Sequence, residues 1–166
     1  MVRSAFIRFL LLGVITLPGV GCDQVTKALA REHLAARAPI SVFHDVVRLQ
    51  YAENRGAFLS AGAHLEETTR QRLLIGGPAA LLTLVATYLL FAPRLSMPAI
   101  AGLGLVIAGG VGNLVDRVVN AGIVIDFLNV GIGPWRTGIF NLADLFLTTG
   151  VLVVLLADRR RSRAPG

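Results

Sequence analysis

Four long apolar stretches divide the chain. They cover residues 5–22, 73–91, 95–115 and 138–157. Each is close to the ~20 residues that a helix needs to cross a hydrocarbon core of roughly 30 Å. Only single charged residues interrupt them, Arg8 in the first stretch and Asp144 in the fourth. The pattern predicts an all-α membrane protein whose core is a bundle of four transmembrane helices.

The segment between the first two stretches, residues 23–72, is the longest polar part of the chain. Within it, residues 40–51 are rich in β-branched and aromatic side chains with polar residues among them, which is typical of short strands. Residues 66–72 have the character of a short surface helix that leads into the second stretch. We therefore expect a small extracytoplasmic β-sheet and a surface helix, joined to the bundle in a single domain of residues 1–166.

Composition and charge agree with a membrane protein and predict its orientation. The chain of 166 residues is 54% hydrophobic and 16% charged, too apolar for an ordinary soluble domain of this length. Basic residues gather at Arg3 and Arg8, at Arg94 and in residues 159–163, and four spans place all of them on one side. Because short cytoplasmic segments carry the excess of Lys and Arg, we expect both termini in the cytoplasm. Residues 23–72 then lie outside a bacterial inner membrane.

Other binding functions find little support. The net charge of +6 could suggest nucleic acid, but no stripe of basic residues interleaved with aromatics is present, so we expect no nucleic-acid partner. The single cysteine, Cys22, excludes an intrachain disulfide and a Cys-rich metal site. His33, His44 and His64 lack the spacing of zinc ligands. We therefore expect neither a metal nor an organic cofactor.

The amino-terminal region offers an alternative interpretation. Basic residues, an apolar run and a cysteine at position 22 resemble a lipoprotein signal peptide, in which Cys22 would carry the lipid. Three further apolar stretches follow, however, and Gly19 stands where such a signal usually has leucine. These observations favour an uncleaved first span.

Two acidic residues lie at the edges of apolar stretches. Asp126 follows the third stretch and Asp144 stands near the start of the fourth, so the expected topology places both at the extracytoplasmic boundary. An acid at a helix centre costs about 2.5–3.5 kcal/mol on insertion scales, so acids in such places mark functional sites. Asn141 lies three residues before Asp144 on one helical face and could orient its carboxylate. Two close carboxylates that share a proton can activate water and protonate an amide, which is the chemistry of peptide hydrolysis.

The spacing alone leaves other roles open. Asp126 could cap a re-entrant turn, and Asp144 could pair with Arg117 or Arg136. A small carrier or channel could use the same acids as a proton relay. Ser60 with a lysine could form the dyad of a different class of membrane peptidase, although no surrounding pattern supports it.

Five short motifs then narrow the choice. They are DQVTK at residues 23–27, NRGA at 54–57, GGVGNLVDR at 109–117, VIDF at 124–127 and FNLAD at 140–144. Each motif is weak by itself. In this order, and with these positions relative to the apolar stretches, they resemble the ordered motifs of the lipoprotein signal peptidases and cover most of the chain.

The resemblance implies a membrane aspartyl endopeptidase with Asp126 and Asp144 as its catalytic dyad. Its implied substrates are lipid-modified prolipoproteins, which it hydrolyses just before the diacylglyceryl-cysteine, and the extracytoplasmic sheet would cradle them. We expect a monomer that works among membrane lipids. Seven further residues are implied to bind substrate or support the site: Asp23, Lys27, Asn54, Gly56, Asn113, Arg117 and Asn141.

Some of these residues also have structural interpretations. Asp23 and Lys27 stand four residues apart, so a simple surface ion pair worth less than ~1 kcal/mol is an alternative. Asn113 and Arg117 have the same spacing and could form a purely structural network.

The chain departs from the family pattern in two places. Phe58 and Leu59 follow Ala57, where the family commonly has Ala-Phe-Ser, and Trp135 is followed by Arg136, where it often has proline. Both departures concern contacts that line the site and leave the dyad unaffected.

Overall fold

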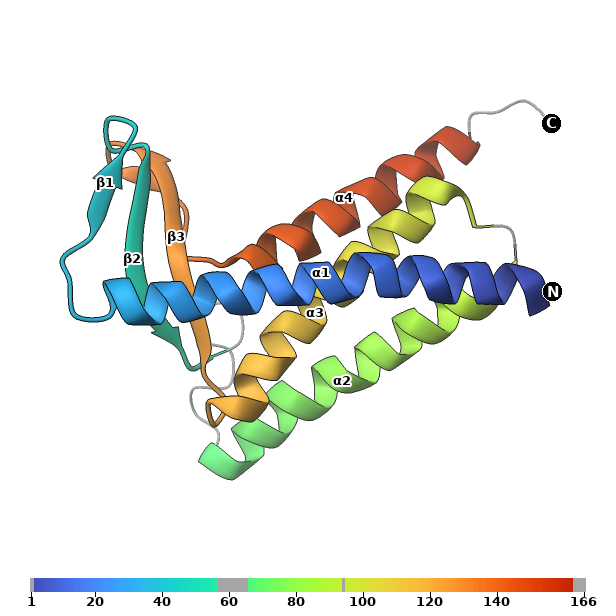
Figure 1. Cartoon of the computed structure of the whole chain (residues 1–166), viewed down its shortest axis with the longest axis horizontal. Coiled ribbons are helices and arrows are strands. Elements are labelled where there is room, and N and C mark those ends of the chain that lie inside the picture. The colour runs from blue at the N-terminus through green and yellow to red at the C-terminus, as the bar shows by residue number, and fades with distance from the viewer. Residues whose placement is uncertain (1, 57–65, 94, 163–166) are drawn as a thin grey trace.

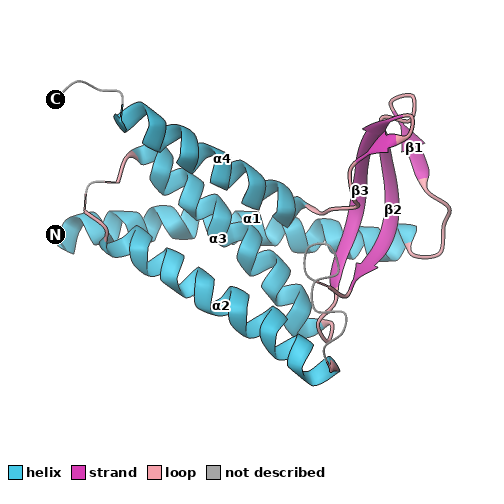
Figure 2. Ribbon diagram, turned by 180° about the vertical axis from the view of Figure 1, so that it is seen from behind, coloured by secondary structure: helices cyan, strands magenta, loops and turns pink. Residues whose placement is uncertain are grey.

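The computed structural model describes residues 2–56, 66–93 and 95–162. Helices and strands follow in the order α1 (Val2–Leu34), β1 (Ile40–Val42), β2 (Val47–Asn54), α2 (Glu67–Phe91), α3 (Met97–Val119), β3 (Val124–Ile132), β4 (Trp135–Arg136) and α4 (Leu142–Ser162). Four helices lie side by side, and the sheet stands across one end of them (Figures 1 and 2). The first turn of α1 and the last turn of α4 lie at the opposite end. The protein is therefore mostly helical, as expected.

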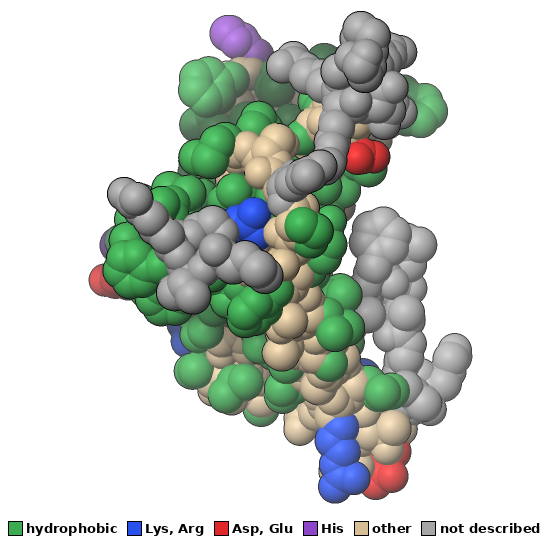
Figure 3. All heavy atoms as spheres, turned by 90° about the vertical axis from the view of Figure 1, so that its right-hand side faces the viewer, with side chains coloured by type: hydrophobic (Ala, Val, Ile, Leu, Met, Phe, Trp, Pro, Cys, Tyr) green, Lys and Arg blue, Asp and Glu red, His purple; other side chains and the backbone are tan. Residues whose placement is uncertain are grey.

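Among the described residues, three helices are long and apolar enough to cross a membrane, namely Ala5–Leu34, Thr68–Phe91 and Met97–Val119. Their outward side chains include Leu17 and Phe91, which are more than 70% exposed. Figure 3, which views the molecule from the end opposite the sheet, shows hydrophobic and uncharged atoms over most of the helices. An apolar exterior of this kind is what lipid contact requires.

Helix α3 contacts all three other helices. Close packing against α4 depends on glycines, because a Cβ at Gly102 would come within 2.8 Å of the Gly150 carbonyl oxygen and one at Gly150 within 2.5 Å of the Gly102 carbonyl oxygen. Small residues allow membrane helices to approach in this way. In the described part of the chain, α2 contacts α1 and α3 but not α4. This leaves a lateral gap between α2 and α4, with α3 behind it.

Helix α1 continues far beyond the predicted end of the first span at residue 22. Its 33 residues correspond to about 50 Å, some 20 Å more than a hydrocarbon core. The additional turns carry Ala30 and Leu34, which form a small buried core with Phe127 of the sheet. The charged residues after Cys22 do not end the helix, because the sheet covers it there.

The sheet is antiparallel in the order β1-β2-β3-β4. Its first two strands lie in or next to the segment predicted to form strands, whereas β3 and β4, which follow α3, were not predicted. The pairing of β2 with β3 runs from Val47 opposite Val130 to Asn54 opposite Val124, with an irregularity between Leu49 and Ala52. This register places the end of β2 beside Asp126.

Two predicted boundaries were wrong. Residues 67–72 are helical, but they form the first turns of α2 rather than a separate surface helix. The fourth helix begins at Leu142 rather than at residue 138, because Phe140 still pairs with Leu128 of the sheet.

Candidate active site

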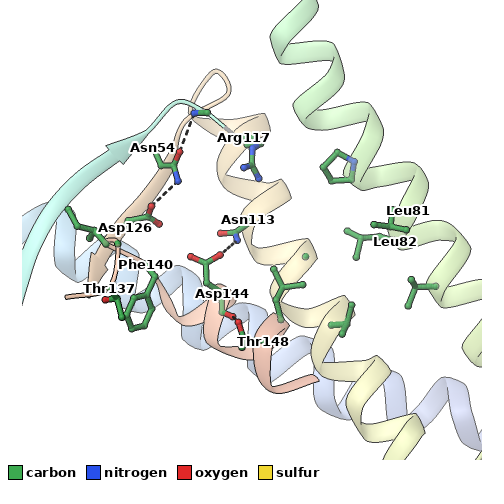
Figure 4. A pocket seen from close by; sticks show the side chains of 18 residues that line it. Asn54, Leu81, Leu82, Asn113, Arg117, Asp126, Thr137, Phe140, Asp144 and Thr148 are labelled. Atoms are coloured by element: carbon green, nitrogen blue, oxygen red, sulfur yellow. Dashed lines mark hydrogen bonds between the residues drawn. The ribbon is translucent and has the colours of Figure 1, made fainter. Parts of the chain in front are cut away.

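A cavity of about 700 Å³ lies between α2, α3 and α4, next to the sheet. Its apolar wall includes Leu81, Leu82, Val85, Val106 and Leu147, and its polar end includes Asn54, Asn113, Arg117, Asp126 and Asp144. Figure 4 shows the two aspartates at this end, with Leu81 and Leu82 on the facing helix. The cavity thus combines a long apolar wall with a small cluster of ionisable groups, as ligand sites commonly do.

Asp126 comes from the sheet. It lies in β3 opposite Ala52 and is 3% exposed. Its Oδ1 accepts a hydrogen bond of 2.7 Å from Asn141 Nδ2, and its Oδ2 accepts one of 3.0 Å from Asn54 Nδ2. Burial raises the pKa of Asp126 to about 6, and the nearby charge of Asp144 adds to the effect, while the bond from Asn54 opposes it. Asp126 lies within a strand, so the alternative in which it caps a re-entrant turn was wrong.

Asp144 comes from the bundle, in the first turn of α4. Its Oδ2 accepts from the backbone N–H of Asn141 at 3.2 Å, and Asn141 Oδ1 accepts from the backbone N–H of Asp144 at 2.9 Å. This reciprocal pair has the geometry of a capping box, here with Asn and Asp in the two positions. Asp144 Oδ1 also accepts from Asn113 Nδ2 at 2.8 Å. The carboxylate therefore stands at the positive end of a helix.

Asn141 joins the two aspartates. It is fully buried, caps α4 beside Asp144 and donates through Nδ2 to Asp126. The same amide nitrogen lies 3.1 Å from Asn113 Oδ1. Two carboxylates from different layers of the fold are thus held at one end of the cavity by shared amides.

Asp23 and Lys27 are buried, so the interpretation as a surface pair was wrong. Their exposures are 0% and 1%. Lys27 Nζ lies 2.8 Å from Asp23 Oδ2 and 3.0 Å from Asp116 Oδ2, and it donates to Asn113 Oδ1 at 2.9 Å. Asp23 Oδ1 accepts from the backbone N–H of Ala143 at 2.9 Å. Neither residue borders the cavity, and both support its wall from behind.

Asn54, Gly56 and Arg117 border the cavity, where the resemblance places substrate contacts. The backbone N–H of Gly56 donates to Asn54 Oδ1 at 3.1 Å. Arg117 Nε is buried and has no hydrogen-bond partner among the described residues. Ala57, Phe58, Leu59, Ser60 and His64 lie outside the described residues.

Arg117 and Arg136 were the two arginines considered as partners of Asp144. Within the described chain, neither forms an ion pair with Asp144. Arg136 instead donates to Asn129 and to the Asp45 carbonyl oxygen, and its Nη1 lies 3.5 Å from Asp45 Oδ2. In place of a proline after Trp135, the arginine thus ties β4 to the hairpin between β1 and β2.

Sequence reasoning did not select Asp116 as a site residue. It is 2% exposed, accepts from the backbone N–H of Ile125 at 3.0 Å and from Gln24 Nε2 at 2.9 Å, and pairs with Lys27. Its position three residues after Asn113 on the same helix face was the available signal. Asp116 therefore connects α1, α3 and the start of β3.

The described residues contain no group of three or more His, Cys, Asp or Glu side chains that could hold a metal ion. An apolar cavity within a helical membrane protein, with two amide-bridged carboxylates at its polar end, is an arrangement that fits a membrane-embedded aspartic peptidase.

Comparisons with known proteins agree with this class. The sequence profile of signal peptidase (SPase) II matches residues 15–158. The lipoprotein signal peptidase of Streptococcus pneumoniae is 35% identical over 152 residues, covering 89% of this chain and 91% of its own length. That of Treponema denticola is 34% identical over 154 residues, covering 87% and 84%. A solved bacterial membrane enzyme shares the fold, with a TM-score of 0.79, 24% identity and coverage of 92% and 90%. The chain therefore belongs to the signal peptidase II family and is a membrane peptidase.

Proposed function

We propose that Asp126 and Asp144 form a catalytic dyad that hydrolyses prolipoproteins just before a diacylglyceryl-modified cysteine. The observation that carries this proposal is the meeting of the two carboxylates at the polar end of an apolar cavity. The relatives' name, lipoprotein signal peptidase, supports the substrate class.

The dyad needs one proton between its two carboxyl groups. One carboxylate removes a proton from water as the water oxygen attacks the carbonyl carbon, and the other carboxyl group gives its proton to the carbonyl oxygen. The resulting diol collapses as the carbon–nitrogen bond breaks. The amine then takes the proton gained from water, and the second carboxylate recovers a proton from a hydroxyl group, which restores the dyad.

The apolar wall provides a place for the lipid. Leu81, Leu82 and Val85 of α2 and Leu147 of α4 border the cavity, and these two helices are not in contact with each other among the described residues. Acyl chains held there would fix the scissile bond at the depth of the dyad. Such positioning alone lowers a barrier substantially.

We infer a topology of four spans with α4 as the fourth, both termini in the cytoplasm and the dyad on the extracytoplasmic side of the inner membrane. The basic residues Arg3 and Arg8 support it, because they precede or begin the first span at the end opposite the sheet. Reporter fusions at residue 50 should report an exported position. A cytoplasmic report from that fusion contradicts the topology. We propose a monomer, because the cavity and both aspartates come from one chain.

A proton relay is the rival use of the same acids. A relay requires neither a structured sheet beside the acids nor two acids at one cavity, and this chain has a sheet next to a cavity that both acids line.

The test is cleavage of a diacylglyceryl-cysteine precursor peptide by the detergent-purified protein, with the non-lipidated peptide of the same sequence as control. We expect cleavage of the lipidated peptide only, one bond before the cysteine. Equal cleavage of both peptides contradicts the role given to the apolar wall, and no cleavage of either contradicts the proposed reaction.

A further inference from the structure

Three amides around the dyad have a fixed orientation. Asn113 Oδ1 faces Lys27 Nζ at 2.9 Å and Asn141 Nδ2 at 3.1 Å. An ammonium group has no acceptor, so only the amide oxygen of Asn113 can face it. The NH₂ group of Asn113 must then point the other way, and there it donates to Asp144 Oδ1 at 2.8 Å.

The other two amides follow the same rule. Asn141 Oδ1 accepts the backbone N–H of Asp144, and Asn54 Oδ1 accepts the backbone N–H of Gly56. A backbone N–H can only donate, so both amides turn their NH₂ groups toward Asp126. Lys27 and Asn141 both donate to the oxygen of the amide that is directed at Asp144, and of the two only Lys27 is charged.

The surroundings of the two carboxyl groups differ. Asp144 accepts a backbone N–H at the start of α4, where the helix dipole favours negative charge. Asp126 lies in a strand without such a dipole, and burial raises its pKa to about 6. The charged groups near Asp144 are Asp126 from β3, Arg117 and Asp116 from α3, and Lys27 and Asp23 from α1.

We propose that Lys27 is a positioning residue that, by holding the Asn113 amide, makes Asp144 the base of the dyad and leaves the shared proton on Asp126. The inference rests on the proposed function. Asp144 takes the proton of the attacking water, and Asp126 gives its proton to the carbonyl oxygen. The ammonium acts through Asn113, because Lys27 is buried and does not border the cavity.

The test compares two variants that both carry Asp116→Asn and differ only at residue 27. Lys27→Met alone would leave Asp23 and Asp116 as unpaired buried charges, so we combine it with Asp116→Asn, which removes one acid together with the base. The control is Asp116→Asn alone, which keeps the bond from Lys27 to Asn113. The readouts are kcat, KM and the pH profile of kcat/KM with the lipidated precursor peptide, alongside the melting temperature.

Relative to the control, we expect the double variant to lose at least tenfold in kcat with little change in KM. The acidic limb of its pH profile should also differ from that of the control, because Asn113 no longer holds a fixed donor toward the base. A change in melting temperature alone, with kcat and the acidic limb equal to those of the control, overturns the proposal and leaves Lys27 a structural role.

A second variant covers failure of the first to fold. Asn113→Asp keeps an oxygen toward Lys27 but replaces the NH₂ group facing Asp144 by another oxygen. We expect a folded protein with a kcat lowered at least tenfold and an altered acidic limb, and a wild-type kcat with a wild-type limb overturns the proposal. Turnover retained in Asp126→Asn or Asp144→Asn would instead refute the dyad itself, so the two failures are distinguishable.

Discussion

Replacing Asp126 by asparagine separates the chemistry of its carboxyl group from its effect on stability. Asparagine keeps the shape of the side chain but cannot exchange a proton. Both oxygens of Asp126 face NH₂ donors, Asn141 at 2.7 Å and Asn54 at 3.0 Å. The new amide must therefore turn its own NH₂ group against one of them. Asn54 is the more exposed partner and can rotate away, at the cost of one hydrogen bond or about 1 kcal/mol.

The ionisation of Asp126 in the wild type changes the stability difference in the opposite direction, in favour of the variant. The pKa of Asp126 rises from 3.8 to about 6 in the folded protein. The stability contributed by this group is therefore complete below pH 4 and is lost as the pH rises through 6. A pKa difference of about two units corresponds to roughly 3 kcal/mol of unfolding free energy. We take about half of that value, because Asp126 borders an open cavity where solvent screens its charge. Asp126→Asn should thus be slightly less stable than wild type at pH 4 and equally or more stable at pH 8.

The assay combines melting temperatures from pH 4 to 8 with cleavage of the lipidated precursor by detergent-purified protein. We expect no measurable turnover at any pH, and a melting-temperature difference that shifts in favour of the variant by a few degrees as the pH rises. Asp144→Asn should be equally inactive, and the double variant no worse than either single one, because the two groups act on one water.

Asp45→Asn is the matched control, because Asp45 lies in the turn between β1 and β2 and does not border the cavity. The hydrogen bond from Arg48 holds the pKa of Asp45 well below its usual range, so the stability it contributes is present above pH 4 and lost as the pH falls. Asp45→Asn should keep full turnover. Its stability relative to wild type should fall as the pH rises, which is the opposite of the trend expected for Asp126→Asn. Wild-type turnover in Asp126→Asn would refute the dyad, and a pH-independent stability difference would refute the argument from burial.

Three further predictions concern other parts of the site. The kcat/KM of the wild type should fall as the pH rises through about 6, where Asp126 loses its proton. Asn54→Ala should move this alkaline limb to higher pH, because the hydrogen bond from Asn54 lowers the pKa of Asp126. An unmoved limb would mean that another group titrates there. Gly112→Ala should lower the melting temperature by several degrees, since the new Cβ would lie 2.6 Å from Asp23 Oδ2. Gly76→Ala is the control, because a Cβ there meets no neighbouring atom within 4 Å. Equal effects of the two substitutions would contradict the packing argument. Cys22→Ala should leave cleavage intact, because Cys22 is exposed and does not border the cavity. Lost turnover in a folded variant would instead indicate a cysteine nucleophile.

Long apolar runs made most of the helical part predictable. A run of about 20 apolar residues has few alternatives to a membrane helix, so α2 and α3 follow from hydropathy within a few residues. The end of α1 could not be predicted this way, because the charges of Asp23 and Lys27 resemble the boundary of a span. The two charges instead pair with each other within α1, and contacts with Asp116, with the start of α4 and with the sheet bury this part of the helix.

The strands after α3 were missed for a different reason. Residues 124–128 are buried or partly buried at every position, so they lack the alternation that identifies a half-exposed strand. Their pairing partner, β2, lies some 70 residues earlier in the chain. The pair of aspartates was accessible from the sequence because acids at membrane boundaries are rare. Their bridging by Asn141, and the buried lysine behind Asn113, depend on side-chain geometry that spacing does not contain.

The two aspartates belong to different layers of the molecule, which explains the charged network behind them. Asp126 is carried by the sheet and Asp144 by the helix bundle, so any movement of one layer against the other would separate the dyad. Helix α1 prevents this, because its outer turns pack against Phe127 while Asp23 holds the start of α4 through Ala143. A buried charge network is an expensive way to stabilise a protein, since each ion loses its hydration. Its three charged residues lie between the sheet and the bundle, where a rigid connection supports the geometry of catalysis.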